Sequence, residues 1–119
     1  MFLIAITGFC VTVNAQSCTI NGAEDGSTVV VKSCYLSGDL VTVNVINDSK
    51  DIMANITVMV EVTYKWGTSI KTQKYDGNEI ALSGVTTKIE IPIDKKNNED
   101  NRYDAISVKA ISISGKKCN

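Results

Sequence analysis

The sequence predicts an all-β fold, an antiparallel sandwich of about seven strands, on three observations. Several short stretches alternate apolar and polar residues, with the two-residue period of a half-buried strand. Val, Ile and Thr, which favour strands, are frequent, and turn signals recur roughly every ten residues. No stretch keeps the 3.6-residue period of a helix for more than a turn or two.

The first expected strands follow turn signals in residues 21–27. A β-branched run over 28–34 is expected to form a strand, and Leu36–Asp39 to turn the chain. The strand expected over 40–46 alternates, with three apolar positions on one face: Val41, Val43 and Val45. A polar loop is expected over 47–51.

Residues 55–66, NITVMVEVTYKW, give the clearest strand pattern. One face carries six apolar positions: Ile56, Val58, Val60, Val62, Tyr64 and Trp66. Gly67–Ser69 is expected to reverse the chain into a strand over 70–75. Asp76–Asn78 has the residues of a second hairpin turn.

The last two expected strands cover 85–93 and 105–114. The first should point Val85, Thr87, Ile89, Ile91 and Ile93 inward, and Pro92 places its end at a sheet edge. A polar loop over 94–102 separates the two strands. The alternation of the second strand slips at Ala110–Ile111, which predicts a bulge. Short strands at this spacing are typical of an immunoglobulin-like β-sandwich.

The N-terminus resembles a signal peptide. A largely apolar twelve-residue run over 2–13 leads into Val13-Asn14-Ala15, a small-residue cleavage pattern, and no Lys or Arg precedes the run. We expect residues 1–15 to be removed and residues 16–119 to form a single β-sandwich domain. The alternative, a first buried strand, stays open. The run is too short to span a bilayer, so we expect a protein that is secreted, to the extracellular space or the endolysosomal lumen, and is not membrane-spanning. Glycosylation sequons at Asn47 and Asn55 agree with export.

Composition argues against several classes of function. The net charge of −1 gives no positive field for nucleic acid. The absence of His rules out Ser-His-Asp and Cys-His catalysis, so we expect no enzyme and no cofactor. The sequence contains no Cys-x-x-Cys pair and no His, so we expect no zinc site. Glu99 and Asp100 lack the ligand spacing of a calcium loop. If Cys10 leaves with the signal, Cys18, Cys34 and Cys118 remain, and one disulfide with one spare thiol is expected.

Three segments resemble a known family in their order. They are CYLSGDLVTVNV from Cys34, IPID from Ile91, and YDAISVKAISISGKKC from Tyr103 to Cys118. This layout resembles the MD-2-related lipid-recognition (ML) family over residues 18–118. The resemblance implies a secreted immunoglobulin-like sandwich that holds a lipid or sterol between its sheets. It also implies a disulfide between Cys18 and Cys118, with Cys34 as a buried thiol or a covalent dimer contact.

Loop-closure entropy leaves the disulfide pairing open. A Cys18–Cys118 bond would stabilise by about 4 to 5 kcal/mol and a Cys18–Cys34 bond by about 3 kcal/mol, and geometry decides between them.

Two functions remain. The first is a lipid- or sterol-binding protein whose cavity is lined by Val43, Val58, Val60, Val62, Tyr64, Trp66, Ile89, Ile91, Ile106 and Val108. The second is a secreted immunoglobulin-like interaction module with a solid core, such as an effector, an allergen or a surface ligand. A carbohydrate-binding module ranks below both, because only Tyr35, Tyr75 and Tyr103 could supply exposed aromatics.

Overall fold

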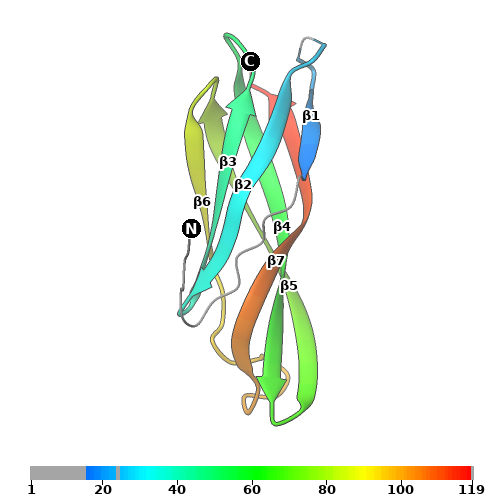
Figure 1. Cartoon of the computed structure of the whole chain (residues 1–119), viewed down its shortest axis with the longest axis vertical. Coiled ribbons are helices and arrows are strands. Elements are labelled where there is room, and N and C mark those ends of the chain that lie inside the picture. Colours follow the sequence, from blue (N-terminus) through cyan, green and yellow to red (C-terminus); the bar gives the residue numbers. More distant parts are fainter. Residues whose placement is uncertain (1–15, 24, 119) are drawn as a thin grey trace, which may run out of the picture.

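The structure, a computed structural model, describes residues 16–23 and 25–118. The expected signal peptide therefore lies outside the described residues. The strands are β1 (Ser17–Asn21), β2 (Thr28–Ser37), β3 (Leu40–Asp48), β4 (Met53–Trp66), β5 (Ser69–Leu82), β6 (Thr86–Pro92) and β7 (Asp104–Lys117) (Figure 1). The prediction of an all-β fold with about seven strands is confirmed. No helix in the described part of the chain is long and apolar enough to cross a membrane.

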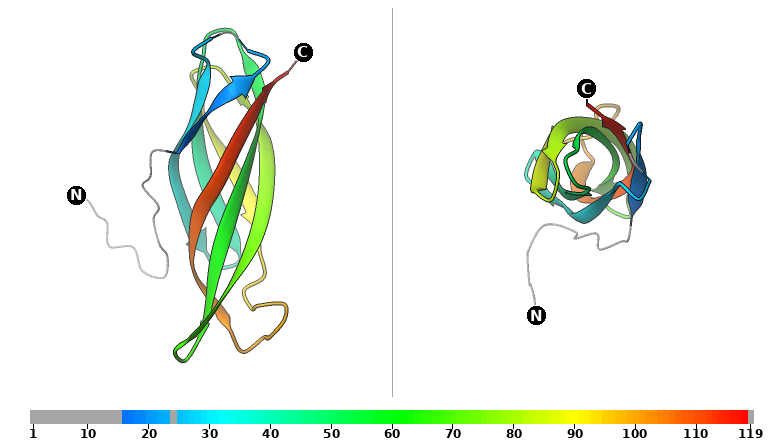
Figure 2. Two further views of the ribbon diagram at one scale, coloured as in Figure 1. Left: turned by 90° about the vertical axis from the view of Figure 1, so that its right-hand side faces the viewer. Right: turned by 90° about the horizontal axis from the view of Figure 1, so that it is seen from above.

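The strands form one continuous sheet in the order β5-β4-β7-β1-β2-β3-β6. Adjacent strands are antiparallel except β1 and β7, which run parallel. Strand β1 bonds to β2 on one side and to β7 on the other, so it joins a β2-β3-β6 layer to a β5-β4-β7 layer. Viewed from above in Figure 2, the sheet curls into a nearly closed ring.

The ring closes where the edge strands β5 and β6 meet. These strands pack against each other but are not hydrogen-bonded neighbours in the sheet. Gly77 of β5 lies so close to β6 that an added Cβ atom would be 2.7 Å from Ile91 Cγ1. The predicted turn at Asp76–Asn78 is wrong, because β5 runs straight through these residues. Gly77 serves close packing there and not a reversal of the chain.

The predicted inward rows form the core. Alternate residues of three strands are buried: Val41, Val43 and Val45 of β3, Ile56 to Tyr64 of β4, and Ile89 and Ile91 of β6. Burying each such side chain stabilises the fold by about 1.5 to 3 kcal/mol. Val85, expected to point inward, is instead 49% exposed, because it lies in the turn before β6.

Local signals identified several irregularities correctly. Gly67 reverses the chain with a φ of 61°. Pro92 ends the edge strand β6, and Ile111 is the extra residue of a bulge in β7 opposite Met59 and Val60. Strand β1 is missing from the prediction, because its alternation covers only five residues, of which only Cys18 and Ile20 are apolar.

Candidate functional site

The predicted cavity-lining residues divide into an inner group and a surface pair. Eight of them are at most 2% exposed and face one another inside the ring: Val43, Val58, Val60, Val62, Tyr64, Ile89, Ile91 and Val108. Trp66 and Ile106 lie at the surface instead, with exposed fractions of 47% and 42%. Trp66 keeps the inward phase of β4 but lies beyond the end of the core.

Two pockets formed by described residues lie together at one end of the molecule. One, of about 540 Å³, is lined by Lys50, Asp51, Ile52, Met53, Leu82 and Ser83. The other, of about 310 Å³, is lined by Asp25, Gly26, Ser27, Asp48, Ser49 and Lys50. Neither pocket includes a predicted lining residue, and both open outward between loops.

The two sequons lie in opposite environments. Asn47 is 0% exposed, and its Nδ2 atom, where a glycan would attach, donates to the carbonyl oxygens of Ile52 at 3.3 Å and Ala81 at 3.0 Å. Its Oδ1 atom accepts a hydrogen bond from Ser49 Oγ. The folded chain therefore has no room for a glycan on Asn47. Asn55 is exposed on the outer face of β4, where a glycan would fit.

The structure does not join Cys18 to Cys118. In the parallel β1–β7 pair Ile20 lies opposite Gly115, so Cys18 is level with Ile113 and Cys118 lies five residues further along. That offset is about 16 Å at the rise of a strand, whereas a disulfide needs Cα atoms within about 7 Å.

The other cysteine pairing is no closer. Cys18 lies opposite Val29, five residues from Cys34 along β2. Burial raises the pKa of the Cys18 thiol. Cys34 is 0% exposed, away from the surface that a dimer contact would use.

A tyrosine pair links β4, β5 and the segment that follows β6. The Tyr64 hydroxyl donates to the carbonyl oxygen of Asp94 at 2.7 Å, and it lies 2.6 Å from the Tyr75 hydroxyl. The backbone N–H of Asp94 donates a hydrogen bond to the Tyr75 hydroxyl at 3.4 Å. Burial raises the pKa of Tyr64 above its ordinary value of 10.0. These hydrogen bonds connect the two edge strands at the seam, the line along which β5 and β6 pack without ladder hydrogen bonds.

The most distinctive surface group lies at the tip of the β4–β5 hairpin. The Arg102 guanidinium lies 4.1 Å from the centre of the Trp66 ring, and the Tyr103 ring is 6.0 Å from it at a 59° tilt. Lys71 Nζ lies 5.4 Å from the centre of the Tyr103 ring. We name these four residues, with Asp100, the end cluster. An Arg over an indole face is a cation–π contact.

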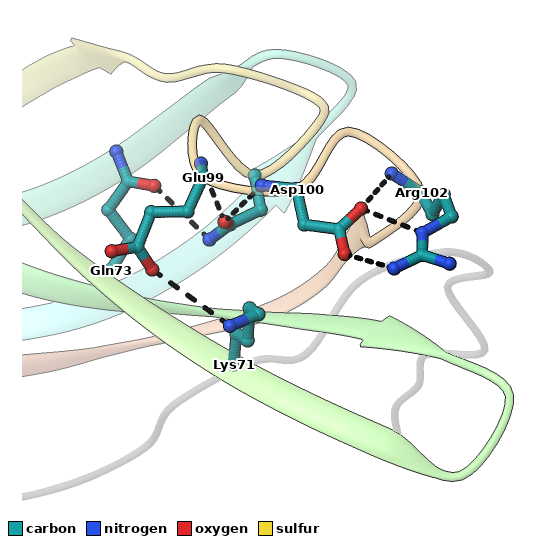
Figure 3. A network of polar contacts seen from close by, with 6 residues as sticks. Lys71, Gln73, Glu99, Asp100 and Arg102 are labelled. Carbon is teal, nitrogen blue, oxygen red and sulfur yellow. Dashed lines mark hydrogen bonds and ion pairs between the residues drawn. The ribbon is translucent and has the colours of Figure 1, made fainter.

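The loop between β6 and β7 (93–103) fixes Arg102 in place, as Figure 3 shows. Asp100 accepts hydrogen bonds from Arg102 through Nε at 2.9 Å and Nη2 at 2.6 Å. These bonds are the main reason that the pKa of Asp100 falls from 3.8 to about 2. The buried Asn97 accepts bonds from the backbone N–H groups of Glu99 and Asp100, which shapes the turn. The end cluster is thus preorganised.

Sequence reasoning found only part of this cluster. The alternation of 55–66 predicts an inner position for Trp66, which instead lies at the surface, and Tyr103, a predicted exposed aromatic, is buried. Tyr35 and Tyr75 are half-buried. Arg102 was missed, because nothing in its polar loop indicates that the loop folds back onto Trp66. Comparison of the chain with protein-family models, curated proteins and solved structures finds no match.

Proposed function

We propose that this protein is a non-catalytic interaction module that acts through the end cluster. The observation that carries the proposal is the Arg102–Trp66 stack, in which a clamped guanidinium holds a large aromatic ring that stays 47% exposed. Trp, Tyr and Arg are the residues most enriched at the energetic centres of protein interfaces. Preorganisation reduces the entropy that binding would otherwise cost.

The interior supports the same proposal. The inner members of the predicted lining set contact one another at 2% exposure or less, as the side chains of a packed core do. The proposal includes export, for which the apolar run over 2–13 and the exposed sequon at Asn55 are the supporting features.

A lipid or sterol carrier is the second candidate. The seam between β5 and β6 favours it, because two edge strands meet there without ladder hydrogen bonds. Parting them at Gly77 would open the inner row to an apolar ligand without breaking a strand pair. The resemblance to the lipid-recognition family points the same way.

Thermal unfolding with added lipid separates the two candidates. Delipidated protein would be mixed with a fatty acid or cholesterol below its micelle or solubility limit, and Tm would be followed by circular dichroism. A ligand that binds only the folded state raises Tm. The interaction module predicts an unchanged Tm and an apo mass in native mass spectrometry. A saturable rise in Tm, lost in a Val60→Trp variant that fills the interior, would establish the carrier instead.

A further inference from the structure

The hairpin tip (65–71) concentrates exposed apolar and basic side chains. Its turn is Gly67–Thr68, and Trp66 lies opposite Ser69 while Lys65 lies opposite Ile70. Ile70 is 60% exposed, and Trp66 is 47% exposed. Exposed large apolar side chains that gather at one place commonly mark a binding surface. The tip is also the extreme end of the molecule in Figure 1.

The hairpin around this tip is positively charged. From Val62 to Tyr75 the sequence contains three lysines, Lys65, Lys71 and Lys74, and no Asp or Glu. Among the described residues, Lys71 Nζ lies 4.0 Å from the Glu99 carboxylate, so Lys65 and Lys74 supply the uncompensated charge of the tip. The carboxylates opposite these two lysines have other partners. Asp104, opposite Lys65, bonds to Lys96 at 2.5 Å, and Glu61, opposite Lys74, pairs with Lys109 at 3.6 Å. An anionic partner would complement this excess of positive charge.

The two apolar side chains of the tip project from opposite faces of the hairpin. Trp66 shares the inward phase of Tyr64, whereas Ile70 shares the outward phase of Lys65, since successive residues of a strand alternate. One flat protein surface could cover only one of them. A fluid layer that receives the tip end-on covers both.

Building on the proposed function, we propose that the partner of the tip is an anionic phospholipid membrane surface. Trp66 and Ile70 enter the boundary between headgroups and acyl chains, where indole rings are favoured. Lys65 and Lys74 remain at the level of the lipid phosphates. Attraction to anionic lipid strengthens binding about fivefold for each lysine at the surface.

The only tryptophan of the chain provides a direct assay, because its emission reports the environment of the tip. Vesicles of phosphatidylcholine with phosphatidylserine are expected to shift Trp66 emission to the blue and to sediment the protein. Vesicles of phosphatidylcholine alone should bind far less, and added salt should weaken binding to the anionic vesicles.

Matched variants locate the contact. Ile70→Ser is expected to weaken binding to anionic vesicles about tenfold, since insertion depends on buried apolar area. Lys65→Gln with Lys74→Gln should weaken it by a similar or larger factor. Leu82→Ser is the control, because Leu82 is 54% exposed at the opposite end of β5. An unchanged Tm verifies that each variant is folded.

Two results would overturn the membrane proposal. One is the absence of a blue shift and of sedimentation with anionic vesicles. The other is an equal loss of binding in Leu82→Ser and Ile70→Ser. If poly-glutamate shifts the emission where vesicles do not, the partner is an acidic protein, and the interaction module survives without the membrane. A rise in Tm with monomeric lipid contradicts the interaction module itself.

Discussion

Asn47 illustrates how one buried polar side chain can link distant parts of the chain. It lies at the end of β3, and its side chain donates to the carbonyl groups of Ile52, before β4, and Ala81, in β5. Its backbone carbonyl oxygen accepts a hydrogen bond from Gly84 N–H at 2.7 Å. Every bond is internal, so its role here is to hold the end of the sheet together. The local sequence Asn-Asp-Ser is the same as that of a glycosylation site, and only burial distinguishes the two roles.

Replacing Asn47 should therefore destabilise the fold. Asn47→Ala leaves the carbonyl oxygens of Ile52 and Ala81 without their donor, and we expect the free energy of unfolding to fall by about 2 to 4 kcal/mol. Urea denaturation measures this change. Asn55→Ala, at an exposed position, should stay within about 0.5 kcal/mol of the wild type. Equal stability of the two variants would contradict the assigned role.

At the scale of elements, the β6–β7 loop and the β4–β5 hairpin form one unit. The loop has little apolar content, and its shape depends on hydrogen bonds that the side chains of Asn97 and Asp100 accept from backbone N–H groups. Arg102 connects this loop to the hairpin, because its guanidinium packs over the Trp66 ring. The exposure of Trp66 is consequently set by an ion pair on another element.

This unit should respond to acid in a defined window. The pKa of Asp100 is depressed from 3.8 to about 2, so its contribution is complete above pH 3.8 and disappears as the pH falls through about 2. Trp66 emission should stay constant from neutral pH to about 4 and change below that value. Asp100→Asn should show the altered emission already at neutral pH.

Glu99→Gln serves as the control for the acid transition. The Glu99 carboxylate lies 4.0 Å from Lys71 Nζ and is 78% exposed, so its removal should leave the transition of Trp66 in place. Far-UV circular dichroism at each pH separates this local change from unfolding. Identical emission of wild type and Asp100→Asn at neutral pH would show that the ion pair does not position the ring.

At the scale of the whole molecule, the near-closure of the ring depends on a packed seam. Gly77→Ala would reduce the entropy of the unfolded chain, which stabilises by about 0.4 to 1 kcal/mol where the site has room. Here the new Cβ atom meets Ile91 Cγ1 at 2.7 Å, and overpacking of this kind costs about 1 to 3 kcal/mol. The clash should win, and thermal unfolding should show a lower Tm.

Asn78→Ala, the next residue of β5 and exposed, is the matched variant for this test. Its Tm should be close to that of the wild type. A Gly77→Ala protein as stable as Asn78→Ala would mean that β5 can move away from β6 freely, as a seam that opens for a ligand requires.

Prediction from sequence succeeded where the local pattern of a single strand determines which of its side chains are buried. The alternation of 40–46 and of 56–64 identified buried rows correctly, because side chains alternate whatever the partner strand is. Trp66 is the exception, since its end of β4 extends beyond the core and leaves it 47% exposed. Prediction failed where the outcome depends on another part of the chain. Gly77 has the local sequence of a turn, and only Ile91 across the seam makes it a strand residue. Arg102 and Trp66 are likewise far apart in the sequence, and no local pattern indicates that the fold brings them into contact.

The position of β7 has a consequence for synthesis of the protein. Strand β7 is hydrogen-bonded between β4 and β1, and without it the β5-β4 hairpin shares no strand ladder with β1-β2-β3-β6. Because β7 follows the other described strands in the chain, the ribosome must release residues 104–117 before the two ladders can join. A chain cut before Gly115 would keep most of the β4–β7 ladder and lose both β1–β7 pairs, Ile20–Gly115 and Asn21–Lys116.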